Sequence, residues 1–281
     1  MGTKTFLTSA ISLLEQIENS YELKSWCQNY SIYGASQGKI WLERELFAFM
    51  EQAYRENVVI TNYYDVIEKW GLKTQDIVSS PLAWLSEQPY LTVLGSIAWH
   101  FRRDHFQNGV LINESIASGT LLRLFRRLNE LCTWPSIATT LPTLYGGGKC
   151  QSVPKVAGVY QIMVPKGMEI HFTDRVSNPY LTTYNVEKLS EKYSKCVDKE
   201  ILYIGKAEGK DGLRQRLFQY MKCGWGGGKN HCGGRAIWQI EDAHLLLLAY
   251  ETCDNASARE RQLINAYKEK NGCLPLANWR M

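Results

Sequence analysis

The chain has 281 residues, enough for one large domain or two modest domains that each bury a core. Its 45% hydrophobic and 21% charged residues are typical of a soluble globular protein, and no apolar run reaches the ~20 residues that cross a bilayer. The formal net charge of +4 comes from residues 146–281, which hold 20 basic and 14 acidic side chains. These features and the lack of a signal-peptide pattern argue against a membrane protein and predict a cytoplasmic location without a membrane partner.

Eight cysteines are scattered along the chain without the spacing of a disulfide framework. In a chain of this length they predict free thiols in a reducing compartment. Structural zinc would require paired ligands, and only Cys223, His231 and Cys232 cluster, with no second pair to complete the site. We therefore do not expect a zinc ion.

The first part of the chain is predicted to be helical. Apolar residues recur at helical spacing in three stretches, 41–57, 91–106 and 118–132. Ser118 is the expected cap of the third stretch. His100 and Asp104 share a face of the second at i, i+4, but a single such pair is more often structural than catalytic. We expect an all-α domain over residues 1–145 that selects a target or a partner.

A linker is predicted over residues 133–156, which hold three prolines and a triple glycine, and we place the domain boundary near residue 146. After it, three stretches rich in β-branched and apolar residues predict strands, at 158–164, 201–205 and 244–253. The amphipathic stretches "GLRQRLFQYM" and "SARERQLINAYKEKNG" predict helices. The fold class is therefore α+β: the helical domain, then a small three-stranded antiparallel or mixed sheet flanked by helices over 146–281, with an insertion at about 165–200.

Five elements of this second domain occur in a recognisable order. They are "GVY" on one strand, "YIG" on the next, "LRQRLFQY" on a helix, a glutamate in a late helix and an asparagine near the end. Together they resemble the GIY-YIG nuclease family over about residues 157–281. The resemblance implies a small α+β nuclease domain that cleaves DNA with a divalent metal ion, Mg²⁺ or Mn²⁺. The long spacing between "GVY" and "YIG" is similar to that of the family's restriction-type members.

Tyr160 and Tyr203 match the two tyrosines of the motif. The resemblance implies that they converge on a metal-bound water, with Tyr160 as the favoured general base. A phenol ionises only near pH ~10, so such a base needs a neighbouring cation. Lys206, directly after the motif, would supply it. Without the resemblance, two ordinary strand tyrosines and a solvated lysine are the simpler interpretation.

Arg216 matches the arginine of the family's helix. Four residues separate it from Tyr220, so the two side chains lie about 40° apart on the helix, at the edge of an apolar stripe. A guanidinium binds phosphate oxygens with two parallel hydrogen bonds and stabilises the charge of phosphoryl transfer. Tyr220 falls where the family carries histidine or tyrosine. The alternative for Arg216 is a surface arginine whose stem covers apolar atoms.

Glu260 has two competing interpretations. The sequence "SARE" is a capping box, in which Glu260 would bond the backbone amide of Ser257. Helical geometry instead places the carboxylate among Leu263, Ile264 and Tyr267 on the apolar face, where a carboxylate is costly unless it is paired or binds a cation. The resemblance implies that this glutamate is the sole protein ligand of the metal, and we assign it so. Magnesium suits one carboxylate plus substrate phosphate.

Asn278 matches the closing asparagine of the family, which is implied to support the metal site and the bound phosphate. Further residues are expected to contact DNA because they are basic or lie in the Gly-rich loop, namely Arg214, Lys222, Lys229, His231 and Arg235. A basic segment is the footprint of a phosphate-binding face, but a solvated surface gives the same composition.

The sequence therefore predicts a metal-dependent DNA endonuclease, most simply a restriction-type or defence nuclease acting on double-stranded DNA. A homodimer or sequential nicking would be needed to cut both strands with one site per chain. Two alternatives stay open: a structure-selective repair or mobile-element nuclease, and a catalytically inactive nucleic-acid-binding protein.

Overall fold

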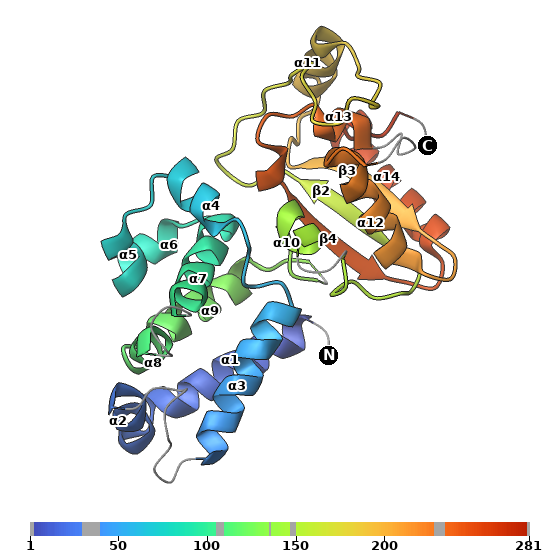
Figure 1. The fold of residues 1–281 in the computed structure, drawn as a ribbon. Coiled ribbons are helices and arrows are strands. Elements are labelled where there is room, and N and C mark those ends of the chain that lie inside the picture. The colour runs from blue at the N-terminus through green and yellow to red at the C-terminus, as the bar shows by residue number, and fades with distance from the viewer. Residues whose placement is uncertain are drawn as a thin grey trace. The chain divides into compact units, whose positions relative to one another are not determined.

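The structure is a computed structural model, and it describes residues 3–29, 40–104, 110–134, 136–146, 150–227 and 234–279 (Figure 1). Residue contacts divide the chain into two compact units, Met1–Ile137 and Ala138–Met281. The division falls earlier than residue 146, because Thr139 and Thr140 pair with a strand of the second unit. Among the helices of the described ranges, none is long and apolar enough to span a membrane.

The described part of the first unit is helical. Its elements are α1 (Thr3–Glu18), α2 (Tyr21–Asn29), α3 (Ile40–Arg55), α4 (Tyr63–Lys69), α5 (Thr74–Ser79), α6 (Leu82–Glu87), α7 (Tyr90–Asp104), α8 (Val110–Ala117) and α9 (Thr120–Leu131). The three predicted helices are confirmed as α3, α7 and α9. The last begins after Gly119, whose φ of 71° suits glycine, rather than at Ser118.

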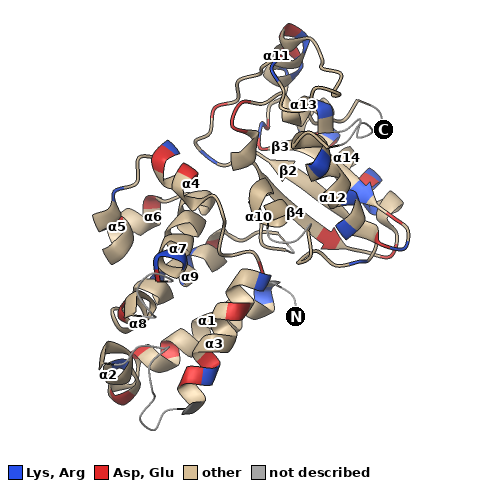
Figure 2. Cartoon of the chain, in the orientation of Figure 1, with Lys and Arg blue, Asp and Glu red and all other residues tan. Residues whose placement is uncertain are grey.

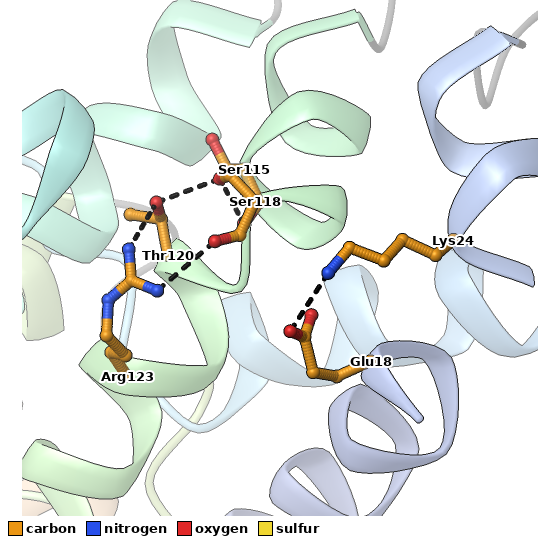
Figure 3. Close-up of polar contacts among 6 residues, drawn as sticks. All are labelled: Glu18, Lys24, Ser115, Ser118, Thr120 and Arg123. Carbon is orange, nitrogen blue, oxygen red and sulfur yellow. Dashed lines mark hydrogen bonds and ion pairs between the residues drawn. The ribbon is translucent and has the colours of Figure 1, made fainter. Parts of the chain in front are cut away.

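Polar side chains of this unit bond to its own backbone. In α9, Arg123 donates to the carbonyl oxygens of Ser79 at 2.8 Å and Ser80 at 3.1 Å. It also donates to the Ser118 carbonyl and to Thr120 Oγ1, both at 3.1 Å (Figure 3). In α7, His100 is fully buried between Ser115 Oγ at 2.7 Å and the Ile77 carbonyl at 3.2 Å. These contacts support the structural interpretation of His100.

The second unit combines one sheet with several helices. Its elements are β1 (Thr139–Thr140), α10 (Leu141–Gly146), β2 (Gly158–Met163), α11 (Val186–Ser194), β3 (Ile201–Ala207), α12 (Gly212–Gly224), α13 (Arg235–Trp238), the 3₁₀-helix η2 (Ala243–Leu245), β4 (Leu247–Thr252) and α14 (Ala256–Asn271). The α+β class is confirmed. The three predicted strands are β2, β3 and β4, and the two-residue β1 is a fourth that the linker composition concealed.

The sheet is antiparallel, with strand order β1-β4-β2-β3. Tyr160 of β2 lies opposite Gly205 of β3 and Tyr250 of β4. Because side chains alternate between faces, Tyr160 and Tyr203 share one face, whereas Ile204 and Lys206 lie on the other. Helix α12 covers the first face and α14 packs its apolar side on Ile204 of the second (Figure 1). As β3 is an edge strand, the two groups of side chains meet around that edge.

Candidate active site

A cluster of three tyrosines fills the face of the sheet under α12. Tyr160 of β2, Tyr203 of β3 and Tyr220 of α12 have ring centroids 5.8–6.2 Å apart. Tyr160 and Tyr220 are fully buried, and Tyr203 is 8% exposed. Gly205 makes this packing possible, because a Cβ there would lie 2.7 Å from atoms of both the Tyr160 and Tyr203 rings. The glycine of "YIG" is therefore required by the rings that the motif brings together.

Arg216 adds positive charge to this cluster from α12. Burial raises the pKa of Tyr160 well above its ordinary value and raises the pKa of Tyr203, while the Arg216 guanidinium lowers both. The fully buried Tyr220 also has a pKa well above its usual range because of burial. The phenols are therefore protonated at neutral pH, with one guanidinium close enough to favour ionisation of the first two.

Lys206 lies on the opposite face from the tyrosines. Its ammonium donates a hydrogen bond to Ser257 Oγ and lies 3.8 Å from Glu208 Oε2 and 3.9 Å from Glu260 Oε2. Ser257 Oγ in turn donates to Glu208 Oε1 at 2.7 Å. We expected Lys206 to be the cation beside Tyr160, but the cation that lowers the pKa of this phenol is Arg216. Lys206 instead neutralises a pair of carboxylates at the edge of β3. Alternation along the strand explains the difference, because Lys206 is an odd number of residues from Tyr203.

Glu260 does not act as the capping residue of α14. The N-cap is Asn255, whose Oδ1 accepts a hydrogen bond from the Ala258 amide at 2.9 Å, and Ser257 lies inside the helix. The Glu260 side chain is 24% exposed. Burial raises its pKa, and Lys206 and Arg216 oppose this by lowering it. The Glu260 carboxylate also raises the pKa of Tyr203, so it interacts electrostatically with both the lysine at the edge and the phenol–guanidinium cluster.

The side chain of Asn278 bonds to the backbone of the same strand. Its Nδ2 donates to the Ile204 carbonyl at 2.8 Å, and its Oδ1 accepts from the Ile204 amide at 3.0 Å. The paired bonds imitate a neighbouring strand, so they fix β3 between Tyr203 and Gly205. This geometry makes Asn278 a support of the site that acts through the strand.

Of the three described residues that were predicted to contact DNA, two are engaged by other groups of the protein. Basic residues occur along α12, which carries Arg214 and Lys222 as well as Arg216 (Figure 2). Lys222 is exposed, but Arg214 donates to the carbonyls of Val153 at 2.6 Å and Gln151 at 2.8 Å. The guanidinium of Arg235 lies over the Tyr184 ring and donates to its hydroxyl at 3.0 Å. Lys229 and His231 lie outside the described residues.

The donor set at the edge of β3 fits a hard divalent cation better than zinc. Glu260 and Glu208 supply carboxylate oxygens on either side of one lysine, which is the chemistry that magnesium or manganese accepts with few protein ligands. Within the ranges that the structure describes, no group of three or more His, Cys, Asp and Glu side chains could hold a metal. His231 and Cys232 of the zinc hypothesis fall outside those ranges.

Two residues of the site, Glu208 and Ser257, were not identified from the sequence. Glu208 follows β3 in an acidic-basic stretch that resembles any solvated loop, and Ser257 was assigned to a capping box. Glu208 is only two residues from Lys206, but the approach of the start of α14 to the end of β3 is what brings Ser257 to both. Comparison of the chain with family models, with curated proteins and with solved structures finds no match in any of the three.

Proposed function

We propose that residues 138–281 form a metal-dependent DNA endonuclease that hydrolyses phosphodiester bonds. The observation that supports it best is the placement of Glu260. This partly buried carboxylate interacts with Lys206 at the edge of β3 and, electrostatically, with Tyr203 and Arg216. A protein that only binds nucleic acid has no use for a carboxylate whose burial disfavours its charged form.

Each side chain has a proposed role in this reaction. Arg216 binds a non-bridging phosphate oxygen and stabilises the charge that grows on it during hydrolysis. Tyr160 first loses its own phenolic proton to solvent, an ionisation that burial opposes and Arg216 favours through their opposite effects on its pKa. The resulting phenolate accepts the proton of the attacking water. Tyr203 and Tyr220 pack against the Tyr160 ring and hold it in place. Lys206 holds Glu260 in place until substrate arrives.

Glu260 would be the ligand of the magnesium or manganese ion, with Glu208 next to it. When bound, the ion supplies Lewis-acid polarisation of the phosphate. Its double positive charge would also compensate a carboxylate that one lysine at 3.9 Å only partly neutralises. The proposed substrate is double-stranded DNA, because residues 146–281 carry 20 basic and 14 acidic side chains.

A restriction-type or other defence nuclease is the biological role that we favour, with structure-selective repair or mobile-element cleavage as the alternatives. The second candidate class is a catalytically inactive nucleic-acid-binding protein, favoured by the burial that keeps Tyr160 protonated. The two classes differ in one measurable respect, which is the dependence of DNA cleavage on a divalent ion.

Plasmid cleavage in Mg²⁺ and in EDTA tests this proposal. The full chain should cut in Mg²⁺ alone, and Glu260→Gln should abolish cutting while DNA binding is retained. Arg216→Ala should lose about 10²–10³-fold in rate, and Arg216→Lys should recover little, because lysine lacks the planar fork. Glu269→Gln, at an exposed position of the same helix as Glu260, is the matched control and should cut normally. Unchanged cutting by Glu260→Gln would contradict the assignment.

A further inference from the structure

The last residues of the described chain run along the outer edge of β3. The Ala277 amide donates to the Leu202 carbonyl at 2.8 Å, and Asn278 makes its paired bonds to Ile204. An edge strand without such a partner would have free backbone groups on that side. Tyr203 of the proposed active site lies between these two attachment points. The position of its phenol therefore depends on how firmly this segment is held.

Lys192 of α11, in the insertion, binds this C-terminal segment. The Lys192 ammonium donates to the carbonyls of Leu276 at 2.7 Å and Asn278 at 2.8 Å, and it lies 4.1 Å from the centroid of the Trp279 ring. The ammonium is withdrawn from solvent, since burial lowers the pKa of Lys192 to about 8. Three partners around one partly buried cation indicate a built contact rather than a surface lysine.

A stack of aromatic and cationic side chains extends from this contact. The face of Trp279 stacks on Tyr184 with centroids 4.6 Å apart, and Arg235 lies over Tyr184 at 4.7 Å. Tyr184 belongs to the insertion, Arg235 begins α13 and Trp279 follows Asn278. Each of the two rings has two neighbours, Trp279 and Arg235 for Tyr184, and Tyr184 and Lys192 for Trp279, so both take part in packing within the unit.

We propose that Lys192 is a positioning residue of the active site, which acts through Asn278 to hold β3 and its Tyr203 in the reactive geometry. The inference rests on the proposed nuclease function for its catalytic consequence. It also assigns a role to the insertion at 165–200, which is then a brace of the catalytic domain. Removing the ammonium should free the Asn278 carbonyl and loosen the paired bonds to Ile204.

The test compares Lys192→Met with Lys188→Met, a change at an exposed lysine on the same helix. Hydrogen exchange should become about tenfold faster at the Ile204 and Ala277 amides in Lys192→Met and stay unchanged in Lys188→Met. Plasmid cleavage by Lys192→Met should lose about 10- to 100-fold in kcat at unchanged KM, the usual range for residues that orient a ligand. Lys192→Arg keeps the cation and should restore part of kcat, which a purely structural defect would not predict.

The two measurements separate the outcomes. If wild-type protein cuts no DNA in Mg²⁺, the proposed nuclease function fails, whereas the exchange experiment still tests the link between Lys192 and β3. If Ile204 keeps its protection in Lys192→Met, or if kcat is unchanged there, the positioning role is overturned. Should Lys192→Met fail to fold, Lys192→Gln carries the test, because the amide retains a donor for one carbonyl. In this variant the Ile204 amide should exchange faster than in wild type, and kcat should be lower than in wild type. Wild-type values for both would again overturn the role.

Discussion

Polar side chains of the helical unit differ from those of the candidate site of the sheet unit in how fully their charges and polar atoms are paired. In the helical unit, Arg123 and His100 reach backbone or hydroxyl partners at hydrogen-bond distance. In the candidate site of the sheet unit, Glu260 Oε2 lies 3.9 Å from the Lys206 ammonium, too far for a hydrogen bond to that group. Burial raises the pKa of Glu260 more than Lys206, through its charge and its backbone amide, and Arg216 lower it. Arg216 acts on two buried phenols whose pKa burial has raised. The first arrangement is typical of a stable scaffold, and the second of a site that a ligand completes.

The comparison predicts that a small change in the sheet unit affects chemistry more than stability. Gly205→Ala would place a Cβ 2.7 Å from ring atoms of Tyr160 and Tyr203, so one ring must move. We expect at least a 100-fold loss of plasmid cleavage, because displacements of about 1 Å have that cost, and a loss of unfolding free energy of about 1–3 kcal/mol. Cleavage assays and urea unfolding measure the two effects.

Gly146→Ala is the control for this substitution. Among the described residues, a Cβ at Gly146 would meet no atom within 4 Å, and this glycine also belongs to the sheet unit. Cleavage and stability should both match wild type. If Gly205→Ala cut DNA as well as Gly146→Ala, the tyrosine cluster would have no part in catalysis.

Local patterns in the sequence were sufficient to predict the fold class and some of the elements of each unit. The helices α3, α7 and α9 and the strands β2, β3 and β4 were predicted because their apolar residues follow helical or strand spacing. The strand β1 could not be, since two threonines in a proline- and glycine-rich stretch carry no periodicity and form a strand only by pairing with β4. Tertiary pairing decides such short elements.

The candidate site could be predicted only in part. The motif pattern indicated Tyr160, Tyr203 and Glu260, and strand alternation could have shown that Lys206 faces away from the tyrosines. By contrast, Lys192 touches the segment 276–279 across more than 80 positions of sequence, so no local pattern indicates it. Arg235 resembled a phosphate ligand because the Tyr184 ring that it contacts lies 51 positions away in sequence, beyond the reach of any local pattern.

In the helical unit, the comparison predicts that a substitution lowers stability. Arg123→Ala removes the donor of four hydrogen bonds, three of them to carbonyl oxygens, and should lower the unfolding free energy by about 3 kcal/mol. Arg126, on the same helix, pairs with Glu15 at 2.7 Å where both side chains are about half exposed, so Arg126→Ala should cost less than ~1 kcal/mol. Urea unfolding, followed by hydrogen exchange in α7 and α9, measures both. Equal effects of the two variants would contradict the distinction between a half-buried arginine with four hydrogen-bond partners and an arginine in an exposed ion pair.

His100 predicts a smaller effect, which depends on pH. Burial lowers the pKa of His100 to about 4, whereas an unfolded histidine has a pKa of 6.5. Between these values the unfolded chain binds a proton that the folded chain does not, so stability is present above pH 6.5 and is lost as the pH falls. We expect the helical unit to lose about 2 kcal/mol of unfolding free energy between pH 7 and pH 5. Urea unfolding at the two pH values measures this loss, again followed in α7 and α9.

His100→Gln should be less stable than wild type at pH 7, because its amide cannot satisfy both Ser115 and Ile77 with the same geometry. Its stability should nevertheless change little between the two pH values, since the titrating ring is gone. An equally steep acid loss in His100→Gln would assign the effect to other groups of the unit.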